Sequence, residues 1–208
     1  MTDLTESLEQ HHRYSASGAD GWMTCSGKNV MEEGIEDTYS PYADEGSAAH
    51  FLASECLSKN RMPESYHHFG IICWEKKGDR DGQCWSAEAL PEGAVQRSIW
   101  KVDTDMVNYI TSFVDYVKEI QGKGTLLVEQ RVHFGNFIGM PGAFGTGDVI
   151  VLSEDGTELT IIDLKYGFKE VSAKENKQMM CYALGALDDH YFKKADVYET
   201  ELSLEDLC

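Results

Sequence analysis

The stretch TIIDLKYG, residues 160–167, begins as an apolar strand and then carries two opposite charges. Its first residues are mostly β-branched, which the interior of a sheet favours. Because side chains alternate along a strand, Asp163 and Lys165 share one face, while Ile162 and Leu164 share the other. A carboxylate and an ammonium on one face of an apolar strand indicate either a solvated edge or a functional site.

A predicted hairpin brings a second carboxylate to this strand. GTGDVIVLS (145–153) and TELTIIDLKYG (157–167) both read as strands, and the Asp-Gly dipeptide at 155–156 is a strong signal for a tight turn between them. A turn centred there places Asp148 directly across from Asp163. Two opposed carboxylates repel each other unless a cation lies between them. The hairpin therefore predicts a site for a divalent metal.

The expected oxygen ligands of this metal are Asp148, Asp163 and the backbone carbonyl of Leu164. Lys165, one pleat along, could orient an attacking water or stabilise charge that develops on a phosphate. Glu129, within the expected strand TLLVEQRVHF, could supply a further ligand. Taken alone, the Asp-x-Lys pair could equally be a solvated ion pair, and Glu129 could simply face solvent.

The remaining patterns predict an α/β domain. Helices are expected at 47–57, where Gly46 ends a loop and Ser47 caps, and also at 103–121 and 174–192, and the glycines of GKG at 122–124 stop the second helix. Apolar pieces on either side of the turn KKGDRDGQ form a second hairpin. The whole chain, 1–208, is expected to be one domain with a mixed central sheet flanked by helices. Residues 1–20 form a loose segment, and Trp22, Met23 and Cys25 are the first expected core contacts.

Composition bounds the class of protein. The 208 residues are 42% hydrophobic, enough for a substantial core, and no apolar run is long enough to span a membrane. A soluble, cytoplasmic protein is expected. The formal net charge of −18 argues against a nucleic-acid binder, because phosphate contacts need Lys and Arg. Carboxylates clustered around a cation are acidic by design, however, and net charge says little about one cleft.

The cysteines are expected to be free thiols. They are scattered without any C-x-x-C pair, which speaks against a zinc ribbon or a compact iron–sulfur motif. No iron–sulfur cluster is predicted. The six positions are Cys25, Cys56, Cys73, Cys84, Cys181 and Cys208.

The motifs together resemble a known family. GDVIVL followed by IIDLKYG looks like the D…(D/E)-x-K signature of the PD-(D/E)xK nuclease superfamily, with Gly147 in place of the proline. QMMCY resembles the Q-x-x-x-Y motif of the RecB-like exonuclease branch, with Gln178 and Tyr182 on one side of a helix. EGSAAH resembles an upstream element that ends in a histidine, here His50. The motif order, with W-x-x-C first, is similar to a phage-borne group of such nucleases and spans roughly residues 14–187.

This resemblance implies a restriction-endonuclease-like fold and a set of roles. Asp148 and Asp163 would bind Mg²⁺ or Mn²⁺, and His50 and Glu129 would complete the metal environment. Lys165 would assist the hydrolytic water, while Gln178 and Tyr182 would position the lysine, the water or the DNA backbone. From the residues alone, His50 could instead be a packed or capping histidine, and Tyr182 a core residue.

The implied activity is metal-dependent hydrolysis of DNA phosphodiester bonds, most simply by an exonuclease acting on DNA ends in phage DNA processing or recombination. DNA is then the substrate, a recombination or single-strand-binding protein is a candidate partner, and relatives allow a homo-oligomer. The chain continues only about two dozen residues past the Q-x-x-x-Y motif, which is shorter than in relatives, and it lacks the cysteine cluster that some of them carry. The alternative is a non-catalytic acidic DNA mimic, or a nucleic-acid-binding protein on a nuclease-derived scaffold.

Overall fold

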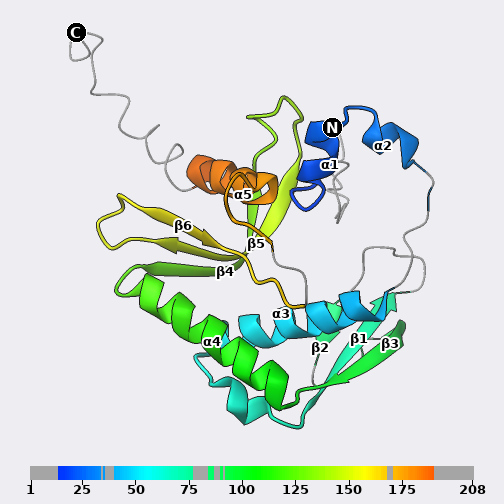
Figure 1. The fold of residues 1–208 in the computed structure, drawn as a ribbon, viewed down its shortest axis with the longest axis vertical. Coiled ribbons are helices and arrows are strands. Elements are labelled where there is room, and N and C mark those ends of the chain that lie inside the picture. Colours follow the sequence, from blue (N-terminus) through cyan, green and yellow to red (C-terminus); the bar gives the residue numbers. More distant parts are fainter. Residues whose placement is uncertain are drawn as a thin grey trace, which may run out of the picture.

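Two small sheets, joined by long helices, make up the described part of the chain (Figure 1). The computed structural model describes residues 14–33, 35, 40–76, 84–86, 90, 92–167 and 171–189. The helical segments are α1 (Ala19–Thr24), α2 (Lys28–Met31), α3 (Pro41–Lys59), the 3-10 turn η1 (Pro63–Tyr66), α4 (Thr104–Gln121) and α5 (Lys177–Leu187). The strands are β1 (Gly70–Lys76), β2 (Cys84–Ser86), β3 (Ala94–Lys101), β4 (Thr125–His133), β5 (Phe144–Leu152) and β6 (Leu159–Ile162).

The strands pair as β2-β1-β3 in one sheet and β4-β5-β6 in the other. The α/β class predicted from the sequence is confirmed. The arrangement differs in one respect: the described strands form two antiparallel sheets of three rather than one mixed central sheet. The first sheet contains the expected hairpin of β1 and β2 and also strand β3, which was not predicted from the sequence.

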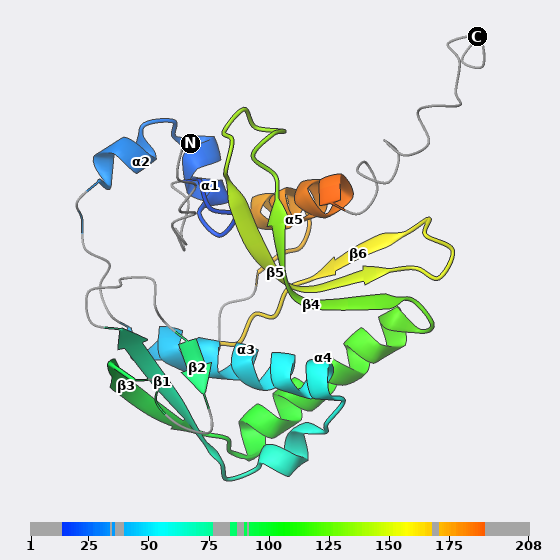
Figure 2. The ribbon, with the colours of Figure 1, turned by 180° about the vertical axis from the view of Figure 1, so that it is seen from behind.

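Helices cover both faces of the β4-β5-β6 sheet. Helix α5 packs on one face and α4 lies on the other, and α3 contacts both this sheet and the β2-β1-β3 sheet (Figure 1). Figure 2 shows the same arrangement from behind, with α3 and α4 side by side. Alternation along β5 matches these two layers: Val149 and Val151 are buried in the core towards α3 and α4, whereas Ile150 is buried in the core towards α5.

The predicted register of the β5–β6 hairpin is confirmed. Val149 pairs with Ile162, so the next position along the hairpin sets Asp148 across from Asp163. Gly156 has a φ of +71°, a left-handed conformation that glycine adopts without a side-chain clash. The last strand is shorter than expected, however. It ends at Ile162, so Asp163 and Lys165 follow the strand instead of lying within it.

The helices begin where polar residues or proline favour a start. Helix α4 matches the prediction, and the Asp103 side chain caps it by accepting a hydrogen bond of 2.9 Å from the amide of Met106. Helix α3 is longer than expected because it starts at Pro41, a residue whose fixed φ suits the first turn of a helix. Ser47 is therefore no cap, and its hydroxyl donates a hydrogen bond of 3.0 Å to the carbonyl of Ala43 inside the helix.

The start of the chain packs more closely than expected. Ala16 and Ala19 are fully buried, Trp22 is half-buried and α1 contacts α5, so residues 14–24 pack against the rest of the protein. Met23 and Cys25, by contrast, are exposed, which corrects their assignment to the core. Residues 1–13 and Cys208 lie outside the described residues. Within the described part, Cys25, Cys56, Cys73 and Cys181 are free thiols, and no helix is long and apolar enough to cross a membrane.

Candidate metal centre

Strands β4 and β5 and the segment directly after β6 place one carboxylate each at the same level of the β4-β5-β6 sheet. Between β4 and β5, Val128 pairs with Val149 and Gln130 pairs with Gly147, so Glu129 stands opposite Asp148. The hairpin register then sets Asp148 opposite Asp163. A row of three acidic residues across adjacent strands is costly unless positive charge lies nearby.

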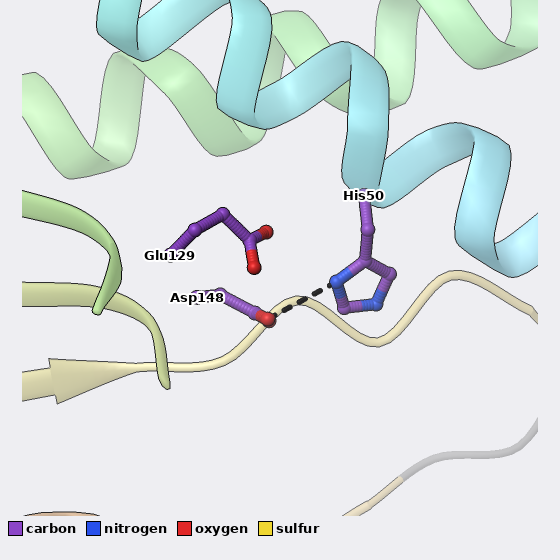
Figure 3. A group of neighbouring side chains, drawn as sticks. All are labelled: His50, Glu129 and Asp148. Atoms are coloured by element: carbon purple, nitrogen blue, oxygen red, sulfur yellow. Dashed lines mark hydrogen bonds and ion pairs between the residues drawn. The ribbon is translucent and has the colours of Figure 1, made fainter. Parts of the chain in front are cut away.

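Helix α3 contributes a histidine to this row. The Nδ1 atom of His50 lies 3.1 Å from Oδ1 of Asp148. One ligand atom each from His50, Glu129 and Asp148 lies within 4.8 Å of the other two, and Figure 3 shows the three side chains pointing towards one another. One imidazole nitrogen and two carboxylates form a donor set that divalent cations accept.

The backbone of Glu129 is unusual for a strand. Its φ is +50°, in the left-handed region that residues other than glycine rarely adopt. The residue is also absent from the β4–β5 ladder, which pairs its neighbours on both sides. A strained residue inside an otherwise regular strand persists only where the surrounding structure enforces it, and such residues cluster at functional sites. The sequence alone contains no signal for this conformation.

Electrostatics favour a cation between these side chains. The pKa of Glu129 is raised to about 7, first because the surrounding protein desolvates its carboxyl and second because the negative charge of Asp148 is close, although His50 opposes the shift. Burial lowers the pKa of His50, but the hydrogen bond and charge of Asp148, with the charges of Glu129 and Asp163, raise it by more. The carboxylates thus lack sufficient positive charge, and a divalent cation would supply it.

A second cluster, built around a lysine, adjoins the row. The Nζ atom of Lys165 lies 2.6 Å from Oδ2 of Asp163 and donates a hydrogen bond of 3.3 Å to Oε1 of Gln178. The side-chain nitrogen of Gln178, Nε2, donates one hydrogen bond to Oδ1 of Asp163 at 3.2 Å and one to the hydroxyl of Tyr182 at 2.9 Å. Hydrogen bonds and an ion pair therefore link four predicted site residues, namely Asp163, Lys165, Gln178 and Tyr182.

Burial shields the carboxylate of this cluster but not its lysine, whose side chain is 41% exposed. The Asp163 side chain is only 7% exposed. Its pKa is raised by that burial and by Asp148, against the lowering effect of the hydrogen bond and charge of Lys165. Burial also raises the pKa of Tyr182 to about 12, so its hydroxyl stays protonated at neutral pH.

A family model described as "Protein of unknown function (DUF2800)" matches residues 11–201. The chain belongs to this DUF2800 family. No solved structure was found to match it.

The described geometry of this DUF2800 protein divides the predicted metal ligands into two groups. His50, Glu129 and Asp148 come together. Asp163 lies beside them but turns its two oxygens to Lys165 and Gln178. Leu164 contacts the site through its amide, because its N–H donates a hydrogen bond of 2.7 Å to Oδ2 of Asp148, and its carbonyl as a ligand stays a prediction.

A small hollow adjoins the three converging side chains. Apart from those residues and Ser54, its lining is apolar, and it consists of Ala53, Leu57, Phe113, Val128, Val149 and Leu164. An apolar wall lowers the local dielectric constant, so charges within it interact more strongly than they do in water.

One contact of the lysine was not anticipated from the sequence. The hydroxyl of Tyr109, on α4, donates a hydrogen bond of 2.7 Å to the backbone carbonyl of Lys165. The only signal in the sequence is a tyrosine on the polar side of a helix, and this pattern occurs on many surface helices. The partner 56 positions away becomes evident only in the folded protein.

Proposed function

We propose that this DUF2800 protein is a divalent-cation-dependent deoxyribonuclease that hydrolyses DNA phosphodiester bonds. One observation carries the proposal: a lysine–carboxylate pair, Lys165 and Asp163, stands beside the converging side chains of His50, Glu129 and Asp148. Ligands for a cation and a fixed ammonium group next to them are what phosphodiester hydrolysis needs, because negative charge develops on the phosphate during the reaction.

The proposed metal ions are Mg²⁺ or Mn²⁺, held by His50, Glu129 and Asp148, with Asp163 as a further ligand. Such a cation, when bound, supplies Lewis-acid polarisation of the phosphate. The donor set fits it, because the oxygen ligands suit both ions and the imidazole suits Mn²⁺ better than Mg²⁺.

The side chains of the lysine cluster would then divide the remaining work. Lys165 orients the attacking water or stabilises the charge on the phosphate oxygens, while water adds to phosphorus and the bond to the leaving oxygen breaks. Gln178 holds Asp163 by a hydrogen bond of 3.2 Å and is itself held by Tyr182. These contacts keep the ammonium in one place before substrate arrives, which lowers the entropic part of the barrier.

The resemblance to RecB-like nucleases supports the finer parts of the proposal. It favours an exonuclease acting on DNA ends in phage DNA processing or recombination, in the cytoplasm of the host cell. It also favours a recombination or single-strand-binding protein as partner, and assembly into a homo-oligomer. The exonuclease activity, the partner and the homo-oligomer are proposed by analogy with that family, from the order of the motifs and not from the geometry of the site.

The net charge of −18 favours a second candidate, a non-catalytic acidic protein that mimics DNA. A mimic needs carboxylates spread over its surface in place of phosphates. It has no use for a lysine whose ammonium is fixed at 2.6 Å from a nearly buried carboxylate. The lysine cluster therefore favours the nuclease.

A cleavage assay distinguishes the nuclease from the non-catalytic DNA mimic. Purified protein is incubated with linear and circular duplex DNA and with Mg²⁺ or Mn²⁺, alongside Lys165→Ala and a control, Lys123→Ala, whose lysine lies in the exposed turn after α4. We expect wild type and the control to degrade linear DNA, Lys165→Ala to lose at least about a hundredfold in rate, and chelator to abolish activity. Intact substrate with wild type in both metals overturns the nuclease proposal. Equal cutting of circles and linear DNA overturns the exonuclease part.

A further inference from the structure

Among the residues that the structure describes, the segment that carries Lys165 has no strand partner. Strand β6 ends at Ile162, and residues 163–167 continue as irregular backbone. A lysine that acts on a substrate must nevertheless be held to within a fraction of an ångström. Some other contacts must therefore fix this part of the backbone.

Two contacts fix the first half of the segment. The amide of Leu164 donates to the carboxylate of Asp148 at 2.7 Å, and the Leu164 side chain is buried in the core beneath α3 and α4. Both act on the residue before the lysine. The carbonyl on the far side of Lys165 needs a partner of its own, since rotation about that peptide unit would move the lysine side chain.

That partner comes from helix α4. The hydroxyl of Tyr109 donates a hydrogen bond of 2.7 Å to the carbonyl of Lys165. The ring of Tyr109 also packs edge-on against the ring of Tyr166, with centroids 5.1 Å apart and an angle of 81° between the planes. Tyr109 thus contacts the backbone of Lys165 and the side chain of the next residue, although 46% of Tyr109 is exposed.

An exposed tyrosine normally contributes little, because water can replace its hydrogen bonds. This one lies on a long and regular helix whose opposite side is buried in the core, so it acts from a rigid base. With the amide of Leu164 held before Lys165 and the carbonyl of Lys165 held after it, the backbone is tied on both sides of the lysine.

We propose that Tyr109 is a positioning residue, which holds the backbone of Lys165 so that its ammonium stays between Asp163 and Gln178. The inference rests on the proposed nuclease function for its catalytic consequence. Tyr109 acts only through Lys165 and touches none of His50, Glu129 or Asp148 among the contacts that the described residues show.

The test is Tyr109→Phe, which removes the hydroxyl and keeps the ring that packs against Tyr166. Its matched control is Tyr116→Phe, because Tyr116 lies on the same helix and is similarly exposed, at 52%. We expect Tyr109→Phe to lower kcat for DNA hydrolysis about three- to tenfold, the range that the loss of one hydrogen bond produces. KM for DNA and the affinity for Mn²⁺ stay unchanged, and Tyr116→Phe behaves as wild type.

A merely structural role would give a different pattern. Loss of kcat together with lower Mn²⁺ affinity and a lower melting temperature would mean that the variant damages the fold generally, and this would overturn the proposal. An unchanged kcat in Tyr109→Phe would overturn it as well.

Amide hydrogen exchange tests the positioning without any activity. In the metal-free protein, we expect the amides of residues 164–167 to exchange faster in Tyr109→Phe than in wild type or Tyr116→Phe. Unchanged exchange there overturns the proposal, whatever the enzyme assay shows. If wild type hydrolyses no DNA, the proposed function fails, and the exchange measurement still decides on Tyr109.

Discussion

The amide of Leu164 donates a hydrogen bond of 2.7 Å to the carboxylate of Asp148. This contact ties the backbone next to Lys165 to the side chain that also meets His50 at 3.1 Å. Asp148 therefore belongs to both halves of the site: one oxygen faces the histidine and the other fixes the segment that carries the lysine. A change at Asp148 should disturb both the cation and the lysine.

Metal affinity should depend on the three converging side chains. We expect Mn²⁺ to bind wild type, and Asp148→Asn or His50→Ala to weaken binding by more than about tenfold, because each removes one ligand or its charge. Isothermal titration calorimetry measures the affinity. The control is Asp115→Asn, an exposed aspartate on α4. Equal affinities for all four proteins would contradict a metal site at this position.

The stability of the metal-free protein should fall as pH rises from about 4.5 to 7. The pKa of Glu129 is raised from 4.5 to about 7, first by desolvation and then by Asp148, so the folded state keeps a proton that the unfolded chain has released. A state that binds more protons loses relative stability as pH increases. The raised pKa of His50 acts in the same direction, because its favourable charge is lost as pH rises through that pKa.

Urea unfolding in the presence of a chelator, between pH 4.5 and 8, measures this effect. We expect Glu129→Gln to show a weaker decline in unfolding free energy than wild type. The difference should be modest, because Glu129 is exposed by its surface area although its carboxyl is partly desolvated, and solvent screens its interactions. Mn²⁺ should restore the stability of wild type at pH 8. Parallel pH profiles of the two proteins would show that Glu129 keeps an ordinary pKa.

Local patterns were sufficient to predict the centre of the site. The Asp-Gly turn and the apolar alternation of its two strands specify a single register, because a slip by one residue would turn every buried side chain outwards. That register sets Asp148 beside Asp163. The four-residue spacing of Gln178 and Tyr182 on a helix likewise predicts that both side chains reach the same place, and they are hydrogen-bonded.

Features that depend on tertiary contacts could not be predicted in this way. Strand β6 ends at Ile162 because the amide of Leu164 bonds to a side chain instead of a strand. The left-handed backbone of Glu129 and the reach of Tyr109 to Lys165 also depend on neighbours that are distant in sequence. The grouping of the metal ligands, with Asp163 turned to the lysine, follows from these contacts and not from residue spacing.

Close packing of α5 on β5 should make Gly145 intolerant of a side chain. A Cβ atom at Gly145 would lie 2.7 Å from Cε1 of Tyr182 and 2.8 Å from Cβ of Ala16. Both distances are far below a normal contact, so Gly145→Ala should destabilise the protein by about 1–3 kcal/mol. It should also displace Tyr182 and, through it, Gln178, and lower the proposed nuclease activity.

Gly147→Ala is the matched control, two residues along the same strand. Its Cβ would lie 3.7 Å from Cγ1 of Ile150 and 3.8 Å from Cδ2 of Tyr182, which are ordinary contacts. We expect its unfolding free energy to stay within about 1 kcal/mol of wild type. Urea unfolding measures the unfolding free energy of Gly145→Ala and of Gly147→Ala. A Gly145→Ala variant as stable as Gly147→Ala would show that α5 can shift without cost.

The ion pair between Asp44 and Arg97 should contribute strongly to stability. Asp44, on α3, is fully buried, and its carboxylate accepts hydrogen bonds from the Arg97 guanidinium and, at 2.6 Å, from the hydroxyl of Ser98. These bonds attach α3 to β3. Asp44→Asn would leave the largely buried guanidinium without its main counter-charge, and we expect a loss of about 3 kcal/mol or more in unfolding free energy.

An exposed ion pair offers the comparison. Lys28 and Glu32 form a pair of 2.7 Å on the surface, and Lys28→Ala should cost less than about 1 kcal/mol, because water screens the charges before and after the change. Unfolding by urea measures both. Because α3 also carries His50, Asp44→Asn should in addition weaken Mn²⁺ binding, whereas Lys28→Ala should leave it unchanged. Equal and small losses in both variants would mean that α3 is held by its apolar contacts alone.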